Sequence, residues 1–216
     1  MIEQRQGVFV YIFGKEDGRS KEERMELAVK DYCNSCSLNF EFEITDMQEV
    51  LRVDRTERGK PYFAKCPKIH FSISHSGAYW VIALADEQVG IDIQEHVRLK
   101  YETIEEAGIR FQKLAHRFFH PVEAKFVEWN SYEHFFTVWT AKESYVKYTG
   151  QGIDDSFSEQ CVIPVEENLW NIFENKENVA WQAQGAWLCK VSCYEGYTLC
   201  VCTKQKEDIV LKLKYN

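Results

Sequence analysis

The sequence of 216 residues lacks a long uninterrupted hydrophobic run. Its longest uncharged stretch, residues 69–85, contains two histidines, three serines and a glycine, so we predict no membrane span. A shorter apolar run at residues 8–13 has no basic cluster before it and no small-residue cleavage site, and we interpret it as a strand rather than a signal peptide. These absences predict a cytoplasmic protein.

A positive net charge is also absent. The 26 basic and 34 acidic side chains give a formal charge of −8, which argues against a general nucleic-acid binder and against docking on anionic membranes. One segment, residues 52–68, departs from this balance because it carries six basic and two acidic side chains. The basic ones are Arg52, Arg55, Arg58, Lys60, Lys65 and Lys68. This segment is suited to hold an anionic small molecule.

The chain also lacks a second pair of cysteines at C-x-x-C spacing. Cys33-x-x-Cys36 has no matching pair at the spacing of a zinc site, although the chain contains eight cysteines. Without an export signal, we expect these cysteines to be free and mostly buried thiols. The alternative is a zinc or thiol-redox protein built on Cys33 and Cys36, which would bind stoichiometric zinc or contain a redox-active pair.

The remaining composition, 45% apolar and 28% charged, is typical of a globular protein with one large domain or two small lobes. Ser20 is the predicted N-cap of a helix, with Glu23 as its capping-box partner. The predicted helices are residues 20–32, 104–119 and 135–148, and a short segment at 122–129 leads into the last of them. The predicted strands are residues 7–13, 40–44, 69–74, 79–85, 88–94, 157–163, 186–192, 197–203 and 209–213. The three strands between residues 69 and 94 are expected to form a meander.

The predicted helix at residues 135–148 places charges where apolar residues are expected. Trp139, Glu143 and Lys147 follow one another at i, i+4 steps, and Lys142 adjoins Glu143. The carboxylate and both amines therefore lie on or beside the apolar face that begins with a tryptophan. A structural explanation is an amphipathic helix with a Glu143–Lys147 surface pair contributing about 0.3 kcal/mol.

Two further polar clusters accompany this helix. Residues 71–77 form a strand that enters a serine-rich turn with one histidine, a turn able to offer hydroxyl, imidazole and backbone N–H groups to a phosphate. In residues 90–94, alternation sends Asp92 and Gln94 to one side while Ile91 and Ile93 enter the core. A strand carboxylate and the Glu143 carboxylate together can hold Mg²⁺ with phosphate oxygens. Each cluster alone also has a structural explanation, such as a loop cap or a structural histidine.

Taken in order, these motifs resemble the 4'-phosphopantetheinyl transferase superfamily, in its larger surfactin-synthetase-activator type. The resemblance covers roughly residues 59–150, and the W-x-x-K-E-S-x-x-K element is its most specific part. The matching motifs are Gly59-Lys60-Pro61, F-x-I-S-H-S-G at residues 71–77, Gly90-Ile91-Asp92-Ile93, Arg117-Phe118-Phe119 followed by Glu123, and Trp139-Thr140-Ala141-Lys142-Glu143-Ser144-x-x-Lys147.

The resemblance implies an α+β fold of two similar lobes, residues 1–87 and 88–216, related by a pseudo-twofold axis with the active site at their junction. It implies transfer of the phosphopantetheine arm of coenzyme A to a serine of an acyl or peptidyl carrier protein. The released product would be adenosine 3',5'-bisphosphate. A monomer is implied as well, whereas the carrier and its pathway (fatty-acid, polyketide or peptide synthesis) stay open. The alternative is a non-catalytic descendant that binds coenzyme A or a carrier protein.

The resemblance also implies residue roles. Asp92 and Glu143 would bind Mg²⁺, with Gln94 standing where the family usually has glutamate. Glu143 or Glu123 would accept the serine proton, and Lys147 would stabilise charge on the diphosphate and the departing group. The implied coenzyme contacts are Lys60, Ser74, His75, Lys142, Lys147 and, by a weaker alignment in a short N-terminal region, Arg19.

Overall fold

The computed structural model describes residues 7–36, 47–130, 132–152, 155–174 and 178–214. Its first sheet has the strand order β10-β1-β5-β4 and contains β1 (Val8–Gly14), β4 (His70–Ser76), β5 (Tyr79–Ala85) and β10 (Ile209–Lys214). Helix α1 (Lys21–Ser35) covers one face of this sheet and begins with the predicted Ser20–Glu23 capping box. The short elements η1 (Lys15–Asp17), α2 (Met47–Val50), β2 (Val53–Arg55) and β3 (Pro61–Phe63) complete this part of the chain.

The second sheet has the order β6-β9-β8-β7 and contains β6 (Val89–Glu95), β7 (Val179–Ala183), β8 (Ala186–Val191) and β9 (Tyr197–Thr203). Its outer face packs against α5 (Tyr132–Thr149), and α3 (Ile104–Phe118) and α4 (Pro121–Asn130) pack against α5. Two 3-10 segments, η2 (Asp155–Phe157) and η3 (Glu167–Glu174), connect α5 to β7. The fold is therefore a mixed α+β fold, as predicted.

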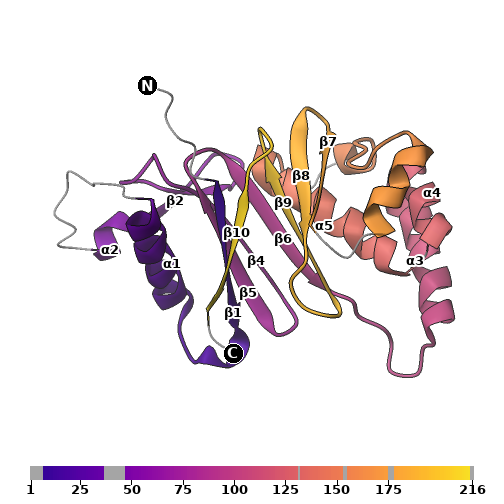
Figure 1. Cartoon of the computed structure of the whole chain (residues 1–216), viewed down its shortest axis with the longest axis horizontal. Helices are drawn as coiled ribbons and strands as arrows, with labels where there is room; N and C mark the ends of the chain where they lie inside the picture. Colours follow the sequence, from indigo (N-terminus) through magenta and orange to yellow (C-terminus); the bar gives the residue numbers. More distant parts are fainter. Residues whose placement is uncertain (1–6, 37–46, 131, 153–154, 175–177, 215–216) are drawn as a thin grey trace.

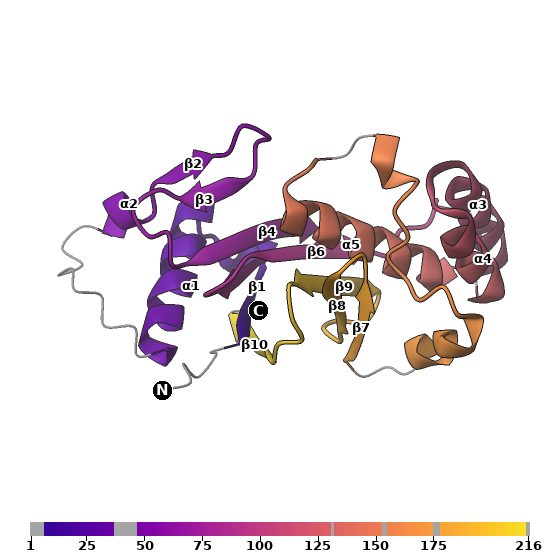
Figure 2. The ribbon, with the colours of Figure 1, turned by 90° about the horizontal axis from the view of Figure 1, so that it is seen from above.

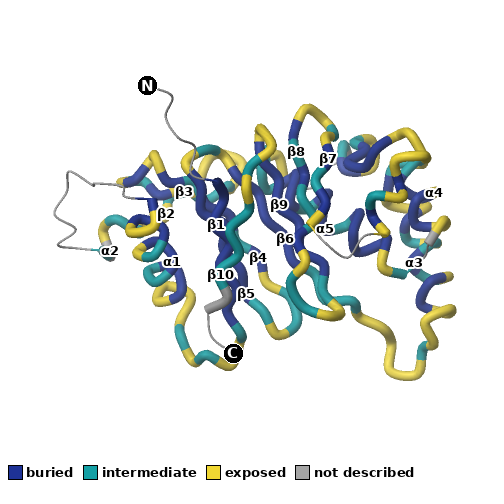
Figure 3. The backbone as a smooth tube through the Cα atoms, in the orientation of Figure 1, coloured by how far each residue is buried: buried dark blue, intermediate teal, exposed yellow. Residues whose placement is uncertain are grey.

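Three apolar clusters set the order of the layers, which is visible from left to right in Figure 1. One cluster lies between α1 and the first sheet, and one lies between the second sheet and α3–α5. The middle cluster joins the two sheets, because Val10 and Ile12 of β1 pack with Ile91 and Ile93 of β6. Figure 3 shows the same central strands as a continuous buried zone. The inward direction of Ile91 and Ile93 confirms the predicted alternation.

The predicted meander is wrong in its third strand. Strands β4 and β5 pair as an antiparallel hairpin, but β6 pairs with β9 in the other sheet. Strands β4 and β6 still lie side by side (Figure 2), because serine side chains of β4 bond to β6 in place of a backbone ladder. Ser72 Oγ accepts the Ile91 N–H at 3.1 Å, and Ser76 Oγ accepts the Glu95 N–H at 3.0 Å.

Other element predictions differ in part. The strand expected at 157–163 is absent, because buried side chains of α4 and α5 bond the backbone at Gln160 and Val162. The short segment at 122–129 is the full helix α4, and Pro121 begins it rather than only ending α3. Strand β7 was not predicted, and the strand expected at 40–44 lies outside the described residues. The remaining predicted helices and strands are confirmed within a few residues.

Gly90 allows α5 to pack closely on β6. A Cβ atom at this position would lie 2.0 Å from the Ser144 carbonyl oxygen and 2.5 Å from the Tyr148 nitrogen, both in the backbone of α5. Because backbone atoms cannot rotate away, Gly90→Ala must push the helix off the strand. We expect the free energy of unfolding to fall by about 1–3 kcal/mol in urea titrations. Unchanged stability would contradict this account of the close approach.

Candidate active site

Asp92 lies on β6, an edge strand of the second sheet that contacts both α5 and β4, an edge strand of the first. Asp92 is 5% exposed, and its Oδ1 accepts hydrogen bonds from Lys147 Nζ and from Ser74 Oγ, each at 2.6 Å. Strand β6 supplies the aspartate, β4 supplies the serine and α5 supplies the lysine. Three segments distant in sequence therefore meet at one carboxylate oxygen.

Glu143 lies one helical turn before Lys147, so the two side chains project from the same side of α5. Burial raises the pKa of Glu143, the Asp92 carboxylate raises it further, and the Lys147 ammonium opposes both effects. A neighbouring carboxylate raises a pKa in this way only at short range. The interaction between the two charges supports the selection of Asp92 and Glu143, and their joint role in binding a metal stays a prediction.

These oxygens form a donor set suited to a hard cation. Gln94 shares a strand face with Asp92, and its amide nitrogen donates to the Glu95 carbonyl oxygen at 3.4 Å. Two carboxylates and an amide oxygen match Mg²⁺, which takes few protein ligands and completes its shell with water and phosphate oxygens. Within the described residues, no group of three or more His, Cys, Asp or Glu side chains forms a metal-binding cluster. A site built on Asp92 and Glu143 would use two carboxylates, because Gln94 supplies an amide in place of a third.

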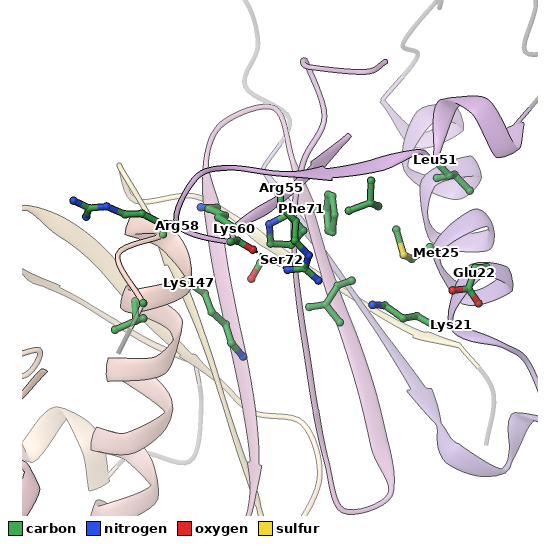
Figure 4. Close-up of a pocket in the computed structure, with 17 residues that line it drawn as sticks. Lys21, Glu22, Met25, Leu51, Arg55, Arg58, Lys60, Phe71, Ser72 and Lys147 are labelled. Carbon is green, nitrogen blue, oxygen red and sulfur yellow. Dashed lines mark hydrogen bonds between the residues drawn. The ribbon is translucent and has the colours of Figure 1, made fainter. Parts of the chain in front are cut away.

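A cavity of about 730 Å³ includes Lys147 in its lining, whereas Asp92 and Glu143 are not among the described residues that line it. It is bounded by α1, the β2–β3 hairpin, β4 and the end of α5 (Figure 4), with Lys147 reaching in from one side and Lys21 from the other. Its charged lining is basic except for Glu22, and its apolar lining includes Met25, Leu51 and Phe71. The basic lining residues are Lys21, Arg55, Arg58, Lys60 and Lys147. The cavity is therefore suited to an anionic molecule with an apolar part.

The basic segment at residues 52–68 contributes to this cavity only in part. Arg55, Arg58 and Lys60 line it, whereas Arg52 and Lys65 form surface ion pairs with Asp54 and Glu49. Lys21, Arg55 and Arg58 were not selected individually from the sequence. The local excess of positive charge was the signal that pointed to the two arginines.

Lys60 is held at the C-terminal end of α5. Its Nζ donates to the Tyr148 carbonyl oxygen at 2.6 Å, and burial lowers the pKa of Lys60 to about 8. A helix C-terminus attracts a cation and so favours the charged form of the lysine. The loss of hydration on burial has a larger effect and lowers the pKa. An anion in the cavity would favour the protonated form of this lysine.

Lys142 and Glu123 do not reach the site, which corrects two predicted roles. Lys142 is 1% exposed, and its Nζ donates to Glu123 at 2.8 Å and to the Gln160 carbonyl oxygen at 2.5 Å. Glu123 is 0% exposed and also accepts the Val162 and His120 N–H groups. Because one residue turns a helix by about 100°, Lys142 and its neighbour Glu143 face different surroundings. Lys142 thus has no path to a coenzyme, and Glu123 has none to a substrate proton.

The other predicted contacts differ in position. His75 is exposed on the side of β4 that also carries Phe71 and Ile73, two cavity residues. Arg19 lies next to the first turn of α1 and forms an ion pair with Asp17 at 3.7 Å. The Ser74 hydroxyl bonds to Asp92 and is not part of the cavity lining found in the described chain. The coenzyme roles of His75 and Arg19 stay predictions.

The cysteines do not support the zinc or redox alternative. All eight are free, and burial raises the pKa of Cys33 to about 11 and also raises that of Cys36. Thiols of this kind are protonated and poorly reactive at neutral pH.

No helix among the described residues is long and apolar enough to cross a membrane.

Comparisons with known proteins all find similarity to phosphopantetheinyl transferases. The model of the 4'-phosphopantetheinyl transferase superfamily matches residues 88–202. A 4'-phosphopantetheinyl transferase of Bacillus subtilis is 38% identical over 110 residues, covering 47% of this chain and 44% of the relative. The 4'-phosphopantetheinyl transferase Sfp of Bacillus subtilis strain 168 is 33% identical over 116 residues, covering 50% and 46%. The human L-aminoadipate-semialdehyde dehydrogenase-phosphopantetheinyl transferase is 34% identical over 110 residues, covering 48% and 36%. The matched part spans less than half the length of these relatives.

Proposed function

Since the chain belongs to the 4'-phosphopantetheinyl transferase superfamily, we propose that it transfers the 4'-phosphopantetheine arm of coenzyme A to a serine of a carrier protein. The other product is adenosine 3',5'-bisphosphate. The observation that carries this proposal is the position of Lys147, which bonds to Asp92 and also lines the basic cavity. A diphosphate bound in the cavity would contact Lys147, whose ammonium group also bonds to Asp92. We further propose that the protein acts as a cytoplasmic monomer.

The two halves of the proposed enzyme have matching topologies. In the first, β1 is followed by a helix and by the β4–β5 hairpin, and β5 pairs between β1 and β4. In the second, β6 is followed by helices and by the β8–β9 hairpin, and β9 pairs between β6 and β8. This equivalence supports two lobes, residues 1–87 and 88–216, with a pseudo-twofold relation and the active site at their junction. Strand β10 is an exception, because it crosses back to pair with β1.

In the proposed mechanism, Asp92, Glu143 and Gln94 would hold Mg²⁺, which would neutralise charge on the diphosphate. Lys147 and Lys60 stabilise the negative charge that grows on the departing bisphosphate. Glu143 accepts the proton of the carrier serine as its oxygen attacks the phosphorus.

The test is a mass measurement on carrier proteins. The protein is incubated with coenzyme A, Mg²⁺ and a panel of apo-carrier proteins of fatty-acid, polyketide and peptide synthesis. At least one carrier should gain the mass of a phosphopantetheine group. If no carrier is modified while an established transferase modifies the same panel, the proposal fails. Coenzyme A binding without any release of bisphosphate would identify the non-catalytic alternative.

The pKa of Lys60 predicts how coenzyme A binding depends on pH. The group is mostly charged at pH 7 and mostly neutral at pH 9, because its pKa is about 8. An anion binds the charged form, so the dissociation constant for coenzyme A should rise about tenfold between pH 7 and pH 9. Calorimetry at three pH values measures this change. Lys60→Arg stays charged throughout and should remove most of the slope. Equal slopes in both proteins would show that another group is responsible.

A further inference from the structure

Three serines alternate along β4 and face β6. The outer two, Ser72 and Ser76, accept backbone N–H groups of β6 and so join the two sheets. The middle one, Ser74, differs because its Oγ donates to a side chain, Asp92 Oδ1, at 2.6 Å. The same strand face therefore combines two structural contacts with one contact to a carboxylate of the proposed metal site.

Ser74 donates its hydroxyl hydrogen to Asp92 and therefore cannot donate it to a coenzyme phosphate at the same time. Ser74 is 7% exposed, and among the described residues the cavity lining includes its neighbours Ser72 and Ile73 but not Ser74 itself. A hydroxyl has one hydrogen to donate, and the carboxylate receives it. The family resemblance implied that this serine seats the coenzyme, and the geometry points elsewhere.

The two side-chain donors to Asp92 end on the same oxygen. Ser74 Oγ from the first sheet and Lys147 Nζ from α5 both bond to Oδ1. Rotation of the carboxylate group would break two charge-assisted hydrogen bonds at once. The pair of donors therefore fixes the plane of the carboxylate, and neither donor occupies Oδ2.

We propose that Ser74 is a positioning residue that orients the Asp92 carboxylate for a divalent cation and does not contact coenzyme A. This inference rests on the metal site of the proposed function. Residues that bond to metal ligands in this way typically change metal affinity by about 10–100-fold when removed. Ser74 also makes the metal site dependent on contact between the two sheets, since it belongs to one and Asp92 to the other.

The test measures cation binding without turnover. Mn²⁺ serves as the probe, and free Mn²⁺ is determined by electron paramagnetic resonance in the absence of coenzyme A. Ser74→Ala should weaken Mn²⁺ binding by at least about tenfold, whereas the matched variants Ser72→Ala and Ser76→Ala should bind like the wild type. Ser74→Thr keeps the donor and should recover most of the affinity. Circular dichroism verifies that each variant is folded.

A second measurement separates this role from a coenzyme contact. Without metal, Ser74→Ala should bind coenzyme A as the wild type does in calorimetry. The inference is overturned if this variant loses coenzyme A affinity and keeps Mn²⁺ affinity, or if all three alanine variants lose Mn²⁺ affinity equally. A wild-type protein that binds no Mn²⁺ would overturn the proposed metal site as well, and the carrier assay would report that failure separately.

Discussion

Glu143→Gln is expected to lower metal-dependent turnover by about a thousandfold or more, equivalent to about 4 kcal/mol of transition-state stabilisation. The change removes one of the two carboxylates of the metal site and also the proposed proton acceptor. The side-chain volume and helix propensity barely change. The fold should be retained, because the substitution removes a buried negative charge that Asp92 repels. Mass spectrometry of the carrier product gives the rate, and thermal unfolding reports the fold.

The control for this variant is Glu133→Gln, an exposed carboxylate in the first turn of the same helix. It loses the same charge from α5 far from Asp92 and should keep most of the turnover. The stability of Glu143→Gln should equal or exceed that of the wild type. The sign follows from the raised pKa, since a carboxylate that is harder to ionise when folded destabilises the protein above its ordinary pKa. Normal turnover in Glu143→Gln would contradict a catalytic or metal-binding role and leave Glu143 as a structural residue of the helix.

The parts of the site that the sequence predicted depend on local periodicity. Alternation in β6 was enough to separate Asp92 from its apolar neighbours Ile91 and Ile93. Helical spacing placed Glu143 and Lys147 on one side of α5. Both rules hold because each position is fixed by its own element, and the close packing at Gly90 then brings the two elements together.

The parts that the sequence could not predict depend on tertiary contacts. Periodicity did not show which charges near the apolar face of α5 would meet Asp92, so Lys142 was assigned to the coenzyme although it is bonded to Glu123 in the core. The residues 157–163 have a strand-like composition, yet side chains of two helices bond their backbone. Lys21 joins Arg55 and Arg58 at the cavity only because α1 and the β2–β3 hairpin both border it. Such contacts between distant segments leave no local pattern.

Lys142→Met is expected to lower the free energy of unfolding by about 3–5 kcal/mol. The variant leaves the Glu123 carboxylate 0% exposed without its cation, and it also frees the Gln160 carbonyl oxygen. Met has a similar length, so the loss reflects the unpaired charge rather than a large cavity. Urea unfolding measures the change. The exposed pair Lys125–Glu167, which links α4 to η3, is the matched control, and Lys125→Met should lose less than about 1 kcal/mol.

The double variant Lys142→Met with Glu123→Gln distinguishes a structural pair from a catalytic one. Replacing both partners removes the unpaired buried charge, so the double variant should be more stable than Lys142→Met alone. Glu123→Gln alone should lose stability because it leaves the Lys142 ammonium buried, 1% exposed, without a carboxylate. The folded fraction of each variant should then modify carriers at a rate near that of the wild type. If Glu123→Gln instead keeps full stability but loses turnover, Glu123 takes part in the reaction. That result would contradict the structural role inferred from its buried contacts.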